Sequence, residues 1–222
     1  RFYDVVDKQD QAKSMYRQAL TLRQDDSDLK TTVARYYLRI NETAEAEALI
    51  EEVLKKRSGY LPAMLLKGEL LVGKRNWSDA IAALDQVIAQ DDKASQAYYF
   101  KGVAHLAKGE VQVARSAFNK AVELNPNDNR TKLVLAEIKL KERDFTGAEQ
   151  DIKAVISVLP DNYQALLLLG KAFLGQGKLD EAQKNFSRLI ELQAQNPEGY
   201  YQRGIVWRLQ KNSGAAMADF ER

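Results

Sequence analysis

Hydrophobic and polar residues along this chain recur with a period of 34 positions, and no insertion interrupts the period. The twentieth position of every repeat is alanine: Ala12, Ala46, Ala80, Ala114, Ala148, Ala182 and Ala216. The twenty-fourth position is always large and apolar, and the eighth is always glycine or alanine. The complete repeats are 27–60, 61–94, 95–128, 129–162 and 163–196, with partial repeats at 1–26 and 197–222. Repetition of this kind predicts a stack of similar units with no single globular core.

Within each repeat the apolar positions fit two α-helices. Positions 4, 8 and 11 share one face of a first helix, which in repeat 95–128 carries Tyr98, Gly102 and His105. Positions 20, 24 and 27 form the facing stripe of a second helix, which in the same repeat carries Ala114, Phe118 and Ala121. Because positions 8 and 20 are small, we expect the two backbones to approach closely, with bulky side chains filling the space around the contact.

Glycine, proline and short polar residues mark the places where the chain must reverse. Lys108–Glu110 and Gly175–Gly177 contain glycine and separate the two helices of a repeat. Asn125–Asp128 and Pro160–Asn162 separate one repeat from the next, where proline ends a helix and Asp or Asn caps the following one. No alternation typical of β-strands is present. The sequence therefore predicts an all-α fold of antiparallel helix pairs.

These features resemble the tetratricopeptide repeat, and the resemblance covers residues 1–222 as a single array. Proline at position 32, another part of that pattern, occurs as Pro126 and Pro160, whereas two repeats have Ser58 and Asp92 there. The resemblance implies a right-handed α-solenoid, a superhelix whose first helices line a concave groove. Because the terminal repeats are incomplete, we expect the first to begin inside a first helix. We also expect either that the repeats continue beyond one or both ends or that the missing turns are disordered.

The resemblance also implies where a partner would bind, because the groove of this family is lined mainly by positions 2, 5, 9, 12 and 13 of the first helices. Positions 5, 9 and 12 lie on a helix face distinct from the packing face of positions 4, 8 and 11. The candidate partner-binding residues are Leu65, Tyr99, Leu106, Arg130, Leu133, Glu137, Leu140, Leu167, Lys171, Leu174 and Tyr201. They form an apolar stripe with charged edges, which suits an amphipathic helix or an extended peptide.

Exposure of these residues admits two interpretations. In the first, the position 5 residues of four repeats are the most exposed to a partner, namely Tyr99, Leu133, Leu167 and Tyr201. In the second, positions 5 and 12 are partly buried against the first helix of the next repeat. The groove positions do not present the Lys, Asn and Arg set with which some members of the family hold a chaperone's C-terminal carboxylates, so that partner is disfavoured.

Residue types that carry catalysis or bind cofactors are scarce. The chain has no Cys and one His, His105, at a packing position where other repeats mostly carry aromatic or aliphatic residues, so we interpret it as structural. The acidic stretch Gln24–Asp28 lacks the glycine and the distal glutamate of a calcium loop and is placed to cap a helix. No glycine-rich phosphate-binding loop occurs. We therefore predict no enzymatic activity, no metal and no cofactor.

Charge and hydropathy narrow the class of partner. The 33 Lys and Arg against 31 Asp and Glu leave a net charge of +2, which provides no basic stripe for nucleic acid or a membrane surface. The longest apolar run, Ala165–Leu169, is far shorter than the roughly 18 residues of a membrane-spanning helix. Four Asn-X-Ser/Thr sequons are interpreted as coincidental, and Trp77, Phe145 and Trp207 as core residues rather than stacking platforms for bases.

Two functions agree with these observations. The first is a non-catalytic scaffold that binds a peptide or helix of a partner protein in its groove. Nearly regular repeats without insertions look most like those of bacterial proteins, including ones that serve envelope and exopolysaccharide assembly, so the periplasm or envelope is favoured over the cytoplasm. The alternative is a regulatory or substrate-recruiting segment of a larger enzyme whose catalytic domain lies outside this chain. Apolar end faces also predict end-to-end self-association.

Overall fold

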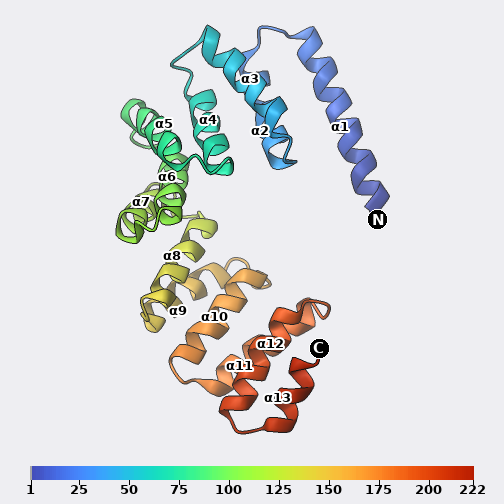
Figure 1. Ribbon diagram of the computed structural model, residues 1–222, viewed down its shortest axis with the longest axis vertical. Helices are drawn as coiled ribbons and strands as arrows, with labels where there is room; N and C mark the ends of the chain where they lie inside the picture. Colours follow the sequence, from blue (N-terminus) through green and yellow to red (C-terminus); the bar gives the residue numbers. More distant parts are fainter. Residues whose placement is uncertain (1) are drawn as a thin grey trace. The chain divides into compact units, whose positions relative to one another are not determined.

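The computed structural model describes residues 2–222, with side chains from Gln9 onward, and shows thirteen α-helices joined by short turns (Figure 1). The helices are α1 (Phe2–Leu22), α2 (Ser27–Arg39), α3 (Thr43–Lys56), α4 (Leu61–Gly73), α5 (Trp77–Gln90), α6 (Ser95–Ala107), α7 (Val111–Leu124), α8 (Asn129–Lys141), α9 (Phe145–Ile156), α10 (Tyr163–Gly175), α11 (Leu179–Leu192), α12 (Pro197–Leu209) and α13 (Ser213–Phe220). No β-strand occurs in these described residues, and the predicted all-α fold is confirmed.

The helices form two compact parts, the N-terminal half (Arg1–Ala114) and the C-terminal half (Arg115–Arg222). In the N-terminal half α2 pairs with α3 and α4 with α5, whereas in the C-terminal half α8 pairs with α9, α10 with α11 and α12 with α13. First helices of adjacent repeats also contact each other, as α2 does α4 and α8 does α10. One expectation is wrong: α1 is continuous, without the predicted turn between a first and a second helix.

Close approach of the two helices in a pair depends on the small residue at position 8, as predicted. A Cβ built on Gly170 of α10 would lie 2.3 Å from the ring of Phe186 on α11, and one built on Gly204 would lie 2.6 Å from the ring of Phe220. Non-bonded carbon atoms prefer separations of about 3.5–4.0 Å. Glycine at position 8 therefore makes room for the aromatic ring at position 24.

The turn between the two helices has the same backbone conformation at position 15 in each of the six repeats from residue 27 onward. Gly109 and Gly177 have φ of +79° and +74°, which glycine adopts without steric cost. The corresponding residues of the other turns also have positive φ, from 61° to 65°, and are Asn41, Arg75, Arg143 and Lys211. For residues with a long side chain this conformation costs about 1–2 kcal/mol. Packing of the helix pairs therefore imposes the turn.

Polar residues between repeats cap the helices that follow, as the sequence predicted. The side chains of Asp26, Asp128 and Asn162 accept hydrogen bonds of 2.9, 3.2 and 2.8 Å from the third residue of α2, α8 and α10. The core is a series of small apolar clusters, each joining neighbouring repeats. One of them unites Ala34 and Ile50 of one repeat with Leu66 of the next.

A charged contact recurs where one repeat meets the next. The residue after the position 20 alanine reaches the turn between the two helices of the following repeat. We call these contacts the inter-repeat clasps, and they are Lys13–Glu42, Glu47–Lys74, Arg115–Glu142 and Glu149–Lys178. Within each half the sign of the first member alternates from one clasp to the next.

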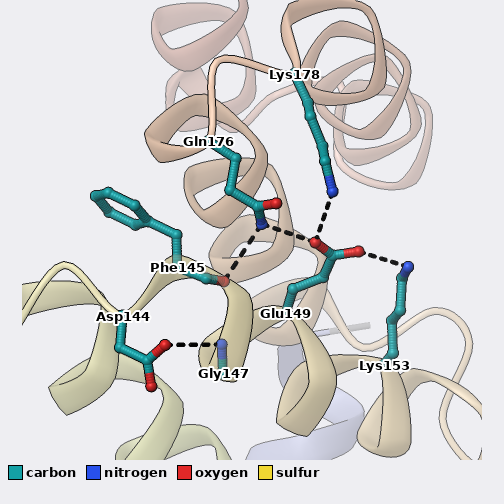
Figure 2. Close-up of polar contacts among 7 residues, drawn as sticks. All are labelled: Asp144, Phe145, Gly147, Glu149, Lys153, Gln176 and Lys178. Atoms are coloured by element: carbon teal, nitrogen blue, oxygen red, sulfur yellow. Dashed lines mark hydrogen bonds and ion pairs between the residues drawn. The ribbon is translucent and has the colours of Figure 1, made fainter.

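The Glu149 clasp shows how such a contact holds two repeats together (Figure 2). The Glu149 carboxylate accepts hydrogen bonds from Lys153 Nζ at 2.6 Å, Gln176 Nε2 at 2.7 Å and Lys178 Nζ at 3.1 Å. The hydrogen bond from Lys153, followed by that from Gln176, outweighs desolvation and lowers the pKa of Glu149 from 4.5 to about 2. The nearly buried carboxylate is therefore charged at neutral pH and ties α9 to the turn between α10 and α11.

Candidate functional site

The two position 5 leucines of the C-terminal half are buried, so the prediction that they are among the most exposed residues is wrong. Leu133 and Leu167 are each 8% exposed. Leu133 belongs to a core cluster that includes Leu168 of the next first helix, and Leu167 to one that includes Val206 of the next first helix. The first helix of the following repeat thus covers position 5, which a helical wheel of a single repeat does not reveal.

Position 12 is also packed. Leu140 and Leu174 are half-buried and lie against the same two core clusters. In the N-terminal half Leu65 lies against a cluster around Leu84, and Leu106 is half-buried. The interpretation that positions 5 and 12 are partly covered by the neighbouring repeat therefore agrees with the surroundings of Leu65, Leu140 and Leu174.

The remaining candidates differ in their surroundings. Tyr201 is 55% exposed, as predicted for position 5, and its ring centroid lies 6.0 Å from that of Phe220. Tyr99 is half-buried and packs edge-on against Phe100, with 5.2 Å between the ring centroids. Lys171 Nζ lies 3.5 Å from a Glu198 carboxylate oxygen, so α10 and α12 share an ion pair.

Three of the predicted residues come together in a pocket of about 430 Å³ in the C-terminal half. Arg130, Leu133 and Glu137 line it from α8, along with Asn129 and Val134. Its other wall consists of residues at and around the turn between α9 and α10: Leu159, Asn162 and Gln164. We call this site the α8 pocket.

The α8 pocket has an apolar centre between two opposite charges. Leu133 is buried and Leu159 is 42% exposed, so an apolar surface faces the solvent-accessible space. Arg130 and Glu137 are exposed and lie three residues before and four residues after Leu133, on the same side of the helix. Glu137 also lies 3.5 Å from Lys141, an exposed pair that contributes little to stability. This arrangement can hold an apolar side chain and orient the charges beside it.

Sequence reasoning missed the wall that the turn between α9 and α10 contributes. The groove positions implied by the resemblance lie on first helices, and the sequence predicts Asn162 only as the cap of α10, a role that it has. A signal was present in Leu159, an apolar residue directly before Pro160 in a turn between repeats. Such a residue belongs to neither helix stripe, and here it remains at the surface.

The structure shows the surroundings of the groups that were considered for metal binding and catalysis. Among the residues whose side chains are described, no cluster of three His, Asp or Glu residues could hold a metal ion. His105 Nδ1 lies 2.5 Å from a Glu110 carboxylate oxygen at the start of α7, which agrees with a structural role. None of the described helices combines the length and apolar character needed to cross a bilayer.

Models of the tetratricopeptide repeat match residues 65–129 and 139–202, which together are more than half of the chain. The chain belongs to the tetratricopeptide repeat family. This family consists of protein-interaction scaffolds and is generally non-catalytic.

Some of the proteins that this chain resembles have names or descriptions that refer to a complex or to peptide binding. Superkiller complex protein 3 of Mus musculus is 27% identical over 180 residues, which are 80% of this chain and 12% of that protein. The structure of PilW, a widely conserved type IV pilus biogenesis factor, has a TM-score of 0.76 at 19% identity and covers 87% of this chain and 90% of PilW. The structure of YrrB, a TPR protein with an unusual peptide-binding site, has a TM-score of 0.67 at 19% identity and covers 78% of this chain and 89% of YrrB. The likeness to these two structures shows the fold alone. This chain spans about an eighth of the length of the mouse relative.

Proposed function

We propose that this chain is a non-catalytic scaffold that holds a segment of a partner protein on its first helices, with the α8 pocket as the anchoring point. The observation that carries this function is the meeting of Arg130, Leu133 and Glu137 in one pocket with an apolar centre. These residues stand at groove positions 2, 5 and 9 of one repeat. The peptide-binding site named for YrrB agrees with this use of the fold.

Binding energy in the α8 pocket would come mainly from its apolar surface. Removing one aliphatic or aromatic side chain of a partner from water is worth about 1.5–3 kcal/mol. Arg130 and Glu137, which are exposed, would set the direction of the bound segment and the rate of association more than the affinity. A single pocket of this kind gives weak binding, so additional contacts on neighbouring first helices are needed for a stable complex.

A photo-crosslinking pair tests the pocket directly. In cells, Leu159→p-benzoylphenylalanine should form a covalent adduct with a partner protein, because residue 159 faces the pocket. Lys184→p-benzoylphenylalanine, at an exposed position of α11 outside the pocket, is the matched control. The adduct should form more slowly when Glu137→Lys is added to the first variant, because this charge contributes to the rate of association. Equal yields of crosslinked adduct from positions 159 and 184 would show that the partner does not bind preferentially at the pocket.

The setting in which we place this scaffold is the assembly of a bacterial envelope structure. The description of PilW as a pilus biogenesis factor supports that setting by analogy of fold alone. Fractionation of cells that express the native gene is the test, with the protein expected in the periplasmic or envelope fraction. Recovery with the cytoplasmic markers would contradict the proposed setting and leave the binding function of the pocket unaffected.

Copies of this chain are also proposed to associate through α12 and α13. These helices expose four large apolar side chains, those of Tyr201, Leu209, Met217 and Phe220. Such a patch on a soluble protein marks a surface for contact with another protein. Sedimentation velocity should show mass that increases with concentration, and Met217→Lys should reduce the increase. A monomer at all concentrations would contradict this association.

A further inference from the structure

The α8 pocket differs from the corresponding place one repeat later at two positions that can be compared directly. One repeat later, Lys171 at position 9 of α10 and Glu198 at position 2 of α12 form an ion pair, with 3.5 Å between Lys171 Nζ and Glu198 Oε1. At the α8 pocket the same two positions carry Glu137 of α8 and Gln164 of α10, which are both exposed and line the cavity. A neutral amide thus stands where a cation would complete an ion pair with Glu137.

The ion pair that Glu137 makes within its own helix is a weak one. Its carboxylate lies 3.5 Å from Nζ of Lys141, one turn later, and the Lys141 side chain is 71% exposed. Exposed pairs four residues apart on a helix contribute about 0.3–0.5 kcal/mol. A carboxylate can accept several hydrogen bonds at once, so a second cation can approach Glu137 from the side of the pocket.

The opposite end of the pocket carries the opposite charge. Arg130 lines this end from the first turn of α8 and is exposed. Arg130 and Glu137 are seven residues apart, which is about 10 Å along a helix that rises 1.5 Å per residue. The lining therefore has a positive end and a negative end on either side of its apolar centre.

Side-chain amides form the rest of the polar lining, and they belong to Asn129, Asn162 and Gln164. Asn162 Oδ1 accepts a hydrogen bond of 2.8 Å from the backbone N–H of Ala165, which leaves the NH₂ group of Asn162 to donate. Amides can both donate to and accept from peptide groups. An extended segment presents its peptide groups to such partners, whereas a helix pairs them internally. The amide lining therefore favours an extended occupant over a helix.

We infer that the segment held in the α8 pocket is extended and carries an acidic and a basic residue three positions apart, with a leucine-like residue between them. At about 3.3 Å per residue, three positions of an extended chain cover the roughly 10 Å between the two ends of the pocket. The acidic group would lie beside Arg130, and the aliphatic group would pack on Leu133 and Leu159. The basic group would lie between Glu137 and Gln164 and complete the missing pair. This inference rests on the proposed function, because it assigns the chemistry of the segment bound at the same pocket.

Three tetrapeptides that differ by single charges test this chemistry. Acetylated and amidated Glu-Leu-Ala-Lys, Glu-Leu-Ala-Gln and Gln-Leu-Ala-Lys would be titrated at millimolar concentration into the nitrogen-15-labelled full chain. All three should shift the amide signals of residues around Leu133, Glu137 and Asn162. Glu-Leu-Ala-Lys should bind about threefold more tightly than each of the others, the gain expected from one partly screened ion pair.

The outcomes separate this inference from the proposed function. Equal affinities of the three peptides, with shifts at the pocket, would overturn the charge pattern and leave the pocket as a site for an apolar side chain. Shifts confined to other helices, or no shifts, would overturn the inference together with the anchoring role of the pocket.

Variants at exposed positions assign each charge of the peptide to its partner. In Glu137→Gln, Glu-Leu-Ala-Lys and Glu-Leu-Ala-Gln should bind equally, whereas Arg130→Gln should abolish the preference for Glu-Leu-Ala-Lys over Gln-Leu-Ala-Lys. Glu191→Gln, which removes an exposed carboxylate of α11 outside the pocket, should retain both preferences. Circular dichroism and melting temperatures should match the parent, because all three residues are exposed. A preference for the lysine peptide that survives Glu137→Gln, or that Glu191→Gln removes, would overturn the proposed pairing.

The spacing of the charges distinguishes an extended segment from a helix. A helical partner would need its two charges seven positions apart to cover the same distance of about 10 Å. Glu-Leu-Ala-Ala-Ala-Ala-Ala-Lys has that spacing, and it should bind no more tightly than the same peptide ending in Gln. A threefold preference confined to this longer pair of peptides would assign the pocket to a helix and overturn the extended occupant.

Discussion

Gly170→Ala should destabilise the protein, although alanine is the better helix former. The added methyl carbon would lie 2.3 Å from Phe186 Cε1 and 2.5 Å from Cζ. Ordinary contact is about 3.5–4.0 Å, so the ring would have to move by more than about 1 Å. Phe186 is fully buried and belongs to a cluster with Ala182 and Leu189, which leaves the ring no room to move.

Two opposing effects set the size of this change. Overpacking of a buried contact costs about 1–3 kcal/mol. Replacement of glycine by alanine inside a helix contributes up to about 1 kcal/mol in the other direction. Gly73 of α4 separates the two effects, because nothing lies within 4 Å of a Cβ built there. Gly73→Ala should be neutral or slightly stabilising, and the two variants should differ by about 1–3 kcal/mol in free energy of unfolding.

Urea denaturation followed by circular dichroism measures both variants under the same conditions. A double-mutant cycle with Phe186→Leu then assigns the effect, because a smaller side chain at 186 should relieve the clash. We expect a coupling free energy of about 1 kcal/mol or more between positions 170 and 186. Equal stabilities of Gly170→Ala and Gly73→Ala, or a cycle without coupling, would refute the close contact of positions 8 and 24.

Three further changes test other parts of the structure. Arg143→Gly should stabilise the protein by about 1 kcal/mol in urea denaturation, because it removes a side chain from a left-handed turn with φ of 65°. Glu149→Gln should lower the stability at neutral pH. Because folding lowers the Glu149 pKa from 4.5 to about 2, the stabilisation by the ionised carboxylate is complete above pH 4.5 and is lost as the pH falls toward 2. The melting temperatures of variant and parent should therefore converge over that pH range. Arg203→Leu leaves the buried Asp219 without its partner and should cost about 3 kcal/mol, most of which Asp219→Leu should restore in the double variant.

The fold could be predicted because small and large apolar residues recur at the same positions of the repeats. Gly170 and Phe186 are 16 residues apart, as are their counterparts in every complete repeat, and the structure brings such positions into contact. The caps at Asp128 and Asn162 follow from local turn chemistry, which a sequence displays directly. That residues 1–222 form one continuous array stays a prediction.

The candidate site could be predicted only in part, because burial at position 5 depends on the neighbouring repeat. Leu133 stands at position 5 and is buried in a cluster that includes Leu168 of the next first helix, a contact that the pattern of a single repeat does not contain. Leu159 was missed because turns between repeats do not follow the helix pattern.

Because the helix pairs are so similar, a repeat could pack during folding against a repeat that is not its neighbour in the chain. The charges of the inter-repeat clasps differ in sign from one junction to the next, and this difference distinguishes the repeats. If a repeat of the N-terminal half docked one place too far along, Lys13 would face the turn that carries Lys74 in place of the turn that carries Glu42. The same error in the C-terminal half would bring Arg115 to the turn that carries Lys178 in place of the turn that carries Glu142. Like charges at such a junction would disfavour the misplaced repeat, so the clasps would favour the native order of the repeats.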